Sequence, residues 1–391
     1  MKDFTAEHIA TLPPSGIRKF FDVVATMENV ISLGVGEPDF QTPKRVREAA
    51  IQSLAEGKTR YSSNWGMPKL RECIVHYLER RFGLVYDTDQ ILCTIGASEA
   101  IDVTLRTVLE IGDEVLIPEP SYVAYKPAVV LQHGVPVVVQ TKAECGFRLQ
   151  AEDLEKAITE KTKVLILPYP NNPTGAILEQ EELQEIAKVC IKHDLLVISD
   201  EIYAELTYGG KNHVSIASME GMAERTVVLN GFAKSFSMTG WRLGYAAGPK
   251  ALMKQINKVH AYIIMCAPTM SQYGAIEALQ DDMLCDADVN HMRKAYDERR
   301  QYLVKTLDGL GLTCFEPEGA FYVFPSIAKT GLTAQAFCEK LLFETGVAVI
   351  PGDAFGESGE NHVRISYAYS MEQLQMAMEK IRVFLEQNGW A

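Results

Sequence analysis

NGFAKSFSMTGWR, residues 230–242, is the stretch that decides the fold of this chain. It follows the apolar, β-branched run Thr226–Leu229, so Lys234 is predicted to lie on a loop at the carboxyl end of a strand. Arg242 follows that lysine eight residues later. In open sheets of parallel strands, ligands bind beyond the carboxyl ends of the strands. The stretch therefore predicts an α/β protein with a ligand site beside Lys234.

Strands and helices alternate through the middle of the chain. Five further β-branched runs are expected to be strands: 114–117, 135–139, 164–167, 195–199 and 243–247. Helical patterns lie between several of them: 97–109, 151–158 and 179–192. Alternation at this spacing predicts a mainly parallel sheet with helices on both faces.

The pattern changes after Pro249. A mostly helical stretch runs from about 251 to 310 and is interrupted at Cys266-Ala267-Pro268. A second α/β region then begins at Gly319–Phe324 and ends in a helix near 371–385. We therefore expect three parts, an N-terminal arm that joins the small domain, a large domain and a small C-terminal domain: residues 1–30, 31–285 and 286–391.

Composition narrows the functional classes. The 391 residues include 51 acidic and 38 basic ones, and the net charge of −13 argues against a nucleic-acid-binding surface. The first ten residues form no apolar signal core, and no apolar run is long enough to span a membrane. The eight cysteines form no CxxC pair, and Cys73 with His76 is interpreted as packing rather than a metal site. We expect a cytoplasmic protein with reduced thiols and no metal.

Two further motifs are predicted to meet Lys234 at one edge of the sheet. Asp200 directly follows the run 195–199, and Asn172 begins an NPTG motif that follows another strand. A lysine that forms an imine, an acid for a pyridine nitrogen and an arginine for a phosphate are what pyridoxal phosphate needs from a protein. Lys234, Asp200 and Arg242 could fill these three roles. Taken singly, a loop lysine is almost always a solvated charge, and an aspartate here could start a loop or cap a helix.

Other residues offer the remaining contacts. Ala97 and Ser98 open a helix whose free N–H groups suit a phosphate. Tyr122 could stack on the ring, although a single aromatic residue is more often part of the core. Tyr203, with Asn172, could hydrogen-bond the phenolic oxygen, and Arg364 in a strand-like run could grip a carboxylate. Each signal is weak alone, and their joint order is the evidence.

At these residues the chain resembles the class I and II aminotransferases, pyridoxal-phosphate enzymes of the aspartate aminotransferase fold (fold type I). The resemblance covers nearly the whole length, from residues 16–20 and SLGVGEPDF at 32–40 to VRISYA at 363–368. It is closest to the bacterial and archaeal branch of aromatic and aspartate aminotransferases. It implies a large domain with a mainly parallel seven-stranded sheet covered by helices, plus a smaller α/β domain.

The resemblance also implies residue roles. Lys234, Asp200 and Tyr203 would be catalytic. The implied cofactor contacts are Lys234, Ala97, Ser98, Tyr122, Asn172, Asp200, Tyr203, Arg242 and Tyr61. The substrate carboxylate would be bound by Gly36, Asn172 and Arg364. Tyr61 would reach the phosphate of the neighbouring subunit, so a homodimer is expected.

Two positions depart from the family pattern. Ala233 stands where a serine usually contacts the phosphate, and Ser235 or Ser237 could replace that contact. Ser98 stands where one branch that acts on aspartate has lysine. This favours aromatic or broad substrate specificity and leaves aspartate open.

The expected activity is ping-pong transfer of an amino group from an L-amino acid to a 2-oxo acid such as 2-oxoglutarate. A carbon–sulfur β-lyase on the same fold is the main alternative, because the first proton abstraction would be shared. A ligand-sensing regulator would need a DNA-binding domain ahead of the family pattern, which starts near Gly16. A nicotinamide dehydrogenase would need a GxGxxG turn after a strand, and the sequence has none there.

Overall fold

The structure is a computed structural model that describes residues 4–12, 27 and 29–390. The motif at 16–20, and with it most of the predicted arm 1–30, lies outside the described residues. The described part of the arm contains one short helix, α1 (Glu7–Ala10).

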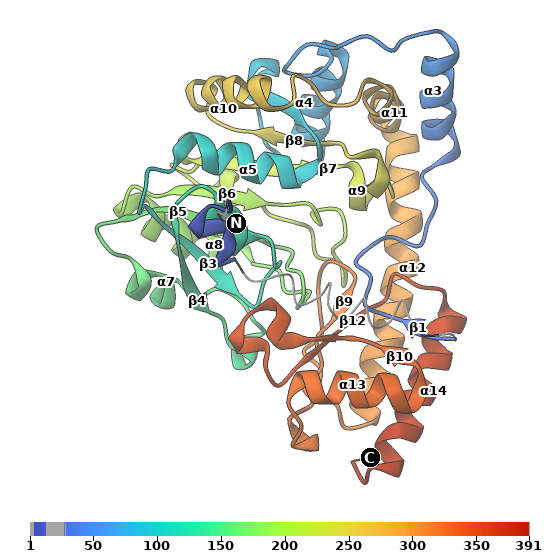
Figure 1. Ribbon diagram of the computed structural model, residues 1–391. Coiled ribbons are helices and arrows are strands. Elements are labelled where there is room, and N and C mark those ends of the chain that lie inside the picture. The colour runs from blue at the N-terminus through green and yellow to red at the C-terminus, as the bar shows by residue number, and fades with distance from the viewer. Residues whose placement is uncertain (1–3, 13–26, 28, 391) are drawn as a thin grey trace.

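A seven-stranded sheet forms the centre of the molecule (Figure 1), as predicted. Its strand order is β2-β8-β7-β6-β5-β3-β4, and β8 alone runs antiparallel to its neighbours. The strands are β2 (Ile91–Thr94), β3 (Glu114–Glu119), β4 (Val135–Gln140), β5 (Thr162–Leu167), β6 (Leu196–Asp200), β7 (Thr226–Gly231) and β8 (Gly244–Ala247). In the register, Leu167 pairs with Ser199 and Asp200 with Leu229, so the carboxyl ends of β5, β6 and β7 lie side by side.

Helices cover both faces of this sheet because its strands are apolar on both sides (Figure 1). Along β5, Val164 and Ile166 belong to one core cluster and Leu165 and Leu167 to another. The first cluster includes residues of α5 (Gly96–Val108), α6 (Tyr125–Leu131) and α10 (Lys250–Ile263). The second includes residues of α7 (Ala151–Ala157) and α8 (Gln180–Lys192).

The C-terminal part is built on smaller sheets. β11 (Ile350–Pro351), β12 (Val363–Ser366) and β9 (Tyr322–Val323) form an antiparallel sheet, and β1 (Ile31–Ser32) pairs with β10 (Val347–Ala348). α13 (Ala334–Thr345) and α14 (Met371–Gln387) pack on them. Through β1, a segment near the start of the chain is thus part of the C-terminal region.

The long helix α12 (Asp282–Gly309) runs between the two parts (Figure 1). The helical stretch predicted at 251–310 breaks after α10, as expected, and again before α12, after α11 (Thr269–Leu279). At that second break, which was not predicted, the Asp281 side chain accepts the Leu284 N–H and caps α12. The predicted division at 285/286 falls within α12 and stays a prediction.

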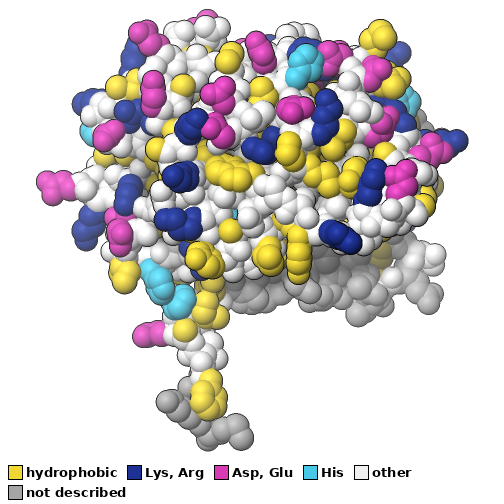
Figure 2. Space-filling view, turned by 90° about the horizontal axis from the view of Figure 1, so that it is seen from above, with side chains coloured by type: hydrophobic (Ala, Val, Ile, Leu, Met, Phe, Trp, Pro, Cys, Tyr) yellow, Lys and Arg dark blue, Asp and Glu magenta, His cyan; other side chains and the backbone are white. Residues whose placement is uncertain are grey.

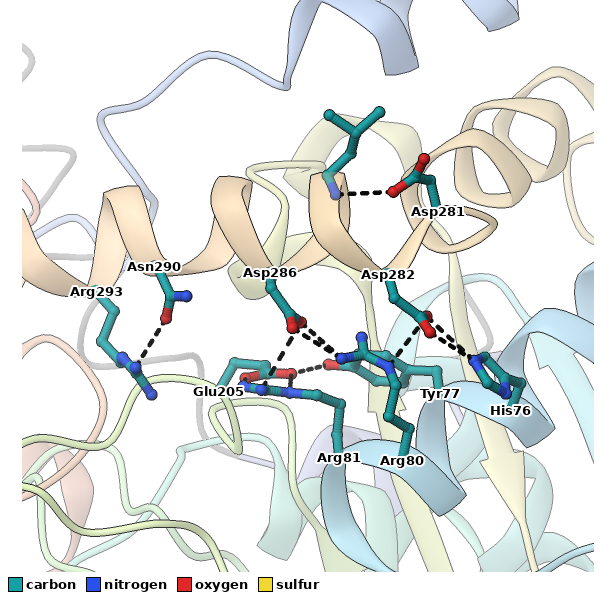
Figure 3. A network of polar contacts seen from close by, with 11 residues as sticks. His76, Tyr77, Arg80, Arg81, Glu205, Asp281, Asp282, Asp286, Asn290 and Arg293 are labelled. Atoms are coloured by element: carbon teal, nitrogen blue, oxygen red, sulfur yellow. Dashed lines mark hydrogen bonds and ion pairs between the residues drawn. The ribbon is translucent and has the colours of Figure 1, made fainter.

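A polar network fixes the first turns of α12 against α4 (Pro68–Phe82) (Figure 3). Arg80 of α4 forms ion pairs with Asp282 and Asp286 of α12, at 3.0 and 2.8 Å. The neighbouring Arg81 pairs with Glu205, whose side chain is almost fully buried. Glu205 lies on the segment that follows β6, so this network holds that segment as well.

Within the described ranges, every helix is too short or too polar to span a bilayer. The eight cysteines, all of which lie in the described part of the chain, are free thiols.

Candidate active site

A pocket with a volume of about 530 Å³ opens at the carboxyl ends of the parallel strands. Ten of the eleven residues predicted to form a site line it: Gly36, Ala97, Ser98, Tyr122, Asn172, Asp200, Tyr203, Lys234, Arg242 and Arg364. Tyr61 does not line the pocket, and its side chain is 79% exposed. The strand ends thus bring together residues that lie more than 300 positions apart in the sequence.

Lys234 lies on α9 (Phe232–Ser235), the single helical turn that follows β7. Its Nζ donates a hydrogen bond of 2.6 Å to the Gly36 carbonyl. Burial lowers the pKa of Lys234 to about 8, against the opposing effect of Glu37. An amine must be neutral to act as a nucleophile or a base. Lys234 reaches this state at a pH more than two units lower than an exposed lysine does.

Asp200 is the last residue of β6 and is buried. Burial raises the pKa of Asp200 to about 6, and hydrogen bonds limit this rise. Tyr125 Oη donates to Oδ2 at 2.8 Å, and the Ile202 N–H donates to Oδ1 at 3.3 Å. The carboxylate is ionised at neutral pH and suited to a cationic ring nitrogen. Sequence reasoning missed Tyr125.

A pair of tyrosines forms another wall of the pocket. The hydroxyl groups of Tyr203 and Tyr322 lie 2.9 Å apart, and burial raises the pKa of Tyr203 well above its usual value. Burial also raises the pKa of Tyr322, so both hydroxyl groups stay protonated. One of them donates to the other, which leaves one of the two protons for a ligand. A Cβ at Gly36 would lie 2.5 Å from Tyr322 Oη, so a glycine is required there. Tyr322 was not predicted as a site residue.

Arg364 enters the pocket from β12 and is buried. Its Nη1 donates to Asn172 Oδ1 at 2.8 Å, and its Nη2 donates to the Gly34 carbonyl at 2.6 Å. Its guanidinium carbon lies 4.5 Å from the ring centre of Tyr322 and 4.7 Å from that of Phe355. Arg364 Nε is buried and has no hydrogen-bond partner among the described residues. The arginine is thus held rigidly, and its guanidinium forms part of the pocket lining.

The opposite end of the pocket suits a phosphate. Ala97 and Ser98 lie in the first turn of α5, where backbone N–H groups have no partner within the helix. Gly96 has a φ of +72°, and a Cβ there would lie 3.0 Å from Arg242 Nη2. Arg242 Nη1 donates to the Thr239 carbonyl at 3.1 Å. Helix dipole, free N–H groups and guanidinium therefore converge on one place.

The expected substitutes for the missing serine do not reach the pocket. Ala233 lines it, but Ser235 and Ser237 do not. Ser237 Oγ lies 3.1 Å from Met292 Sδ instead. The pocket lining therefore gives no support to either serine as a substitute for the contact absent at Ala233. Thr239 does line the pocket, and its hydroxyl donates to Glu37.

Tyr122 lies just before α6 and is partly exposed to the pocket. Its ring meets that of Tyr125 edge-on, with the ring centres 5.6 Å apart. This contact orients Tyr122 through the same tyrosine that holds Asp200.

Comparisons with known proteins agree with this geometry. The family model of class I and II aminotransferases matches residues 28–381. An aspartate aminotransferase of Pyrococcus abyssi is 46% identical over 98% of both chains. An aromatic-amino-acid aminotransferase of Thermococcus litoralis is 44% identical over 98% of both. The crystal structure of an aromatic aminotransferase from Pyrococcus horikoshii superposes with a TM-score of 0.91, at 45% identity, over 96% of this chain and 100% of that one.

Proposed function

Because the chain belongs to the class I and II aminotransferases, we propose that it transfers the amino group of an L-amino acid of aromatic or broad side-chain type to a 2-oxo acid such as 2-oxoglutarate. It is a pyridoxal-phosphate-dependent transaminase, as its family implies. The observation that carries the assignment is the single pocket in which Lys234, Asp200, Arg242 and Arg364 meet.

The residues of the pocket fit pyridoxal phosphate. Lys234 would take the aldehyde, and Asp200 would hold the proton on the ring nitrogen. Ala97, Ser98 and Arg242 would bind the phosphate, in the cradle that a Cβ at position 96 would fill. When bound, the cofactor supplies a ring that withdraws electrons from the substrate's α-carbon.

The other side chains orient this chemistry. Tyr203 would donate to the phenolic oxygen, with the Asn172 side chain next to it, and Tyr122 would cover a face of the ring. Arg364 would bind the substrate carboxylate, supported by its place in the pocket lining and its fixed position. Lys234 Nζ, neutral near pH 8, would accept the proton of the substrate α-carbon.

The charges of the pocket support aromatic or broad specificity. Three cationic side chains line it among the described residues, and each has a proposed partner: Lys234, Arg242 and Arg364. No further lysine or arginine of the described chain lines it to receive a second carboxylate. Tyr122 and Tyr322 offer aromatic surface instead. Aspartate is the second candidate, since relatives of both names match the chain.

A half-reaction screen tests this specificity. Purified holoenzyme is mixed with single amino acids from the aromatic, acidic, aliphatic and sulfur classes, and spectral conversion of the cofactor is followed. We expect the aromatic amino acids to convert it fastest. Conversion by aspartate and glutamate alone would contradict the proposal.

The same mixtures test the β-lyase alternative, for which the comparisons offer no support. Without an acceptor, a transaminase releases about one equivalent of 2-oxo acid per active site and then stops. Continuing release of pyruvate and ammonia from cysteine-like substrates would instead establish a lyase.

We further propose a cytoplasmic homodimer in which Tyr61 completes the partner's site. Exposed apolar residues support this interface. Tyr262 is 89% exposed, and the residues that follow it are also apolar and partly exposed. Asn64 donates to the Met265 carbonyl at 2.7 Å, which holds the segment bearing Tyr61 next to this apolar segment. On the face seen from above, hydrophobic side chains gather between charged ones of both signs (Figure 2).

A further inference from the structure

A buried acid–base pair lies directly behind the phosphate end of the pocket. His260 of α10 is fully buried, and its Nδ1 lies 2.6 Å from Glu99 Oε1. Since a carboxylate only accepts, the Nδ1–H donates this bond. The His260 Nε2 atom is buried and has no partner among the described residues. A fully buried ring with one unpaired nitrogen is costly in a core, and the bond from Nδ1 to Glu99 offsets part of that cost.

Glu99 in turn holds the start of α5. Its Oε2 accepts the Ile95 N–H, which lies immediately before the turn formed by Gly96, Ala97 and Ser98. Both carboxylate oxygens are therefore engaged away from the pocket. Thr94 Oγ1 adds a bond of 3.0 Å to the Gly96 carbonyl, so the turn is fixed from both sides.

The direction of the Glu99 carboxylate matters because its charge could repel a bound phosphate. Glu99 is an anion in the first turn of the helix whose N-terminus faces the phosphate end of the pocket. Unless it is paired and turned away, it would repel a bound phosphate, most strongly where water is excluded. The bond to His260 keeps the carboxylate on the far side of the turn.

We propose that His260 and Glu99 are a positioning pair that shapes the turn 95–98 for the cofactor's phosphate. Neither residue lines the pocket, so they act only through the turn. The inference rests on the proposed function, which assigns the phosphate to Ala97, Ser98 and Arg242.

The test compares two ligands of the apoenzyme, pyridoxal phosphate and pyridoxal, which lacks the phosphate. Spectroscopic titration gives the Kd of each for the wild type and for His260→Ala, His260→Asn and Glu99→Ala. Asn places an N–H donor close to the position of Nδ1 and is the conservative variant. Lys258→Ala, on the exposed face of the same helix, is the matched control.

We expect His260→Ala and Glu99→Ala to raise the Kd of pyridoxal phosphate about tenfold and to leave the Kd of pyridoxal unchanged. His260→Asn should recover most of the loss, and Lys258→Ala should bind both ligands as the wild type does. Equal losses for both ligands, no loss for either, or tighter binding of pyridoxal phosphate by Glu99→Ala would overturn the proposal. If His260→Ala does not fold, Glu99→Ala and His260→Asn carry the test.

Arg242→Ala separates this inference from the site assignment on which it rests. If Arg242→Ala does not weaken the binding of pyridoxal phosphate more than that of pyridoxal, the assigned phosphate position is wrong. If Arg242→Ala discriminates between the two ligands and the His260 and Glu99 variants do not, only the positioning pair is wrong.

Discussion

Burial brings the pKa values of the two central residues close together. The pKa of Lys234 falls to about 8 and that of Asp200 rises to about 6, each because the pocket disfavours its charge. Between these values Asp200 is ionised while Lys234 still carries its proton, and above pH 8 the amine is free. Perturbed groups of this kind in one pocket are typical of catalytic sites.

Tyr125→Phe tests how Asp200 is tuned. The Tyr125 hydroxyl lowers the pKa of Asp200 against the effect of burial, so its removal should raise that pKa above about 6. Only the ionised form pairs with a protonated ring nitrogen. Cofactor affinity of the apoenzyme should therefore rise with pH through a midpoint higher than that of the wild type. Titrations between pH 5 and 8 would measure it, with Tyr122→Phe as control. A midpoint that stays or moves to lower pH would contradict this role.

Ala233→Ser tests the effect of the alanine that stands before Lys234, where the family usually has serine. The pocket contains neither Ser235 nor Ser237, so a hydroxyl at position 233 would be a new donor rather than a redundant one. We expect cofactor binding as tight as in the wild type or tighter by about 1 kcal/mol, the contribution of one neutral hydrogen bond. The dissociation constant of pyridoxal phosphate measures this, and looser binding would refute the account of this position.

Sequence motifs identified the residues that carry charge in the pocket and missed those that support them. Lys234 and Asp200 stand in recognisable contexts at strand ends, and Arg364 stands in a recognisable strand-like run. Tyr322 has no such context, because its role depends on a contact with Tyr203, 119 positions away. The sequence left the direction of Ser235 and Ser237 open for the same reason, since a residue's direction on a short turn depends on the backbone that follows it.

At the scale of elements, patterning predicted six of the seven strands of the central sheet and the helices α5, α7, α8 and α14, but not α4 or α13. The strand β2 was not predicted, because Ile91–Thr94 is short and lies far in sequence from its partner β8. The break before α12 was not predicted, because Asp281 caps this helix and no glycine or proline nearby marks the break. The network in Figure 3 could not be predicted at all, because it joins α4, α12 and the segment after β6 through side chains.

Arg81→Ala tests the contribution of that network. It would leave the buried Glu205 carboxylate without its cationic partner, which should cost about 3 kcal/mol of unfolding free energy. Arg80→Ala is the matched control, because its acidic partners are partly exposed and the loss should be less than about 1 kcal/mol. Urea unfolding of both variants measures the difference. Equal losses would show that the burial of Glu205 does not decide the outcome.

At the scale of the molecule, the proposed dimer rests on the position of Tyr61. Its side chain is exposed and lies outside the pocket of its own chain, next to an exposed apolar segment. The proposed cofactor contact of Tyr61 and its outward position are both expected if a second copy completes the site. The sequence indicated this only through the resemblance, because one chain's pattern does not specify its partner.

Mixing two impaired variants tests the shared site. When Tyr61→Ala and Lys234→Ala subunits are unfolded together and reassociated, half of the dimers should be mixed, and each should contain one intact site. Activity should therefore rise to about a quarter of the wild-type value, above that of either parent. If Tyr61 served its own chain, the mixed dimers would contain no intact site and the activity would not rise.

The central claim is that Lys234 moves the substrate proton, and single-turnover kinetics of Lys234→Ala test it most directly. The variant is loaded with cofactor and mixed with an aromatic amino acid, and release of the 2-oxo acid is timed against Lys250→Ala, an exposed lysine. We expect the rate for Lys234→Ala to fall by about a thousandfold, the usual contribution of a general base, and that for Lys250→Ala to match the wild type. An undiminished rate for Lys234→Ala would show that the base has been assigned wrongly.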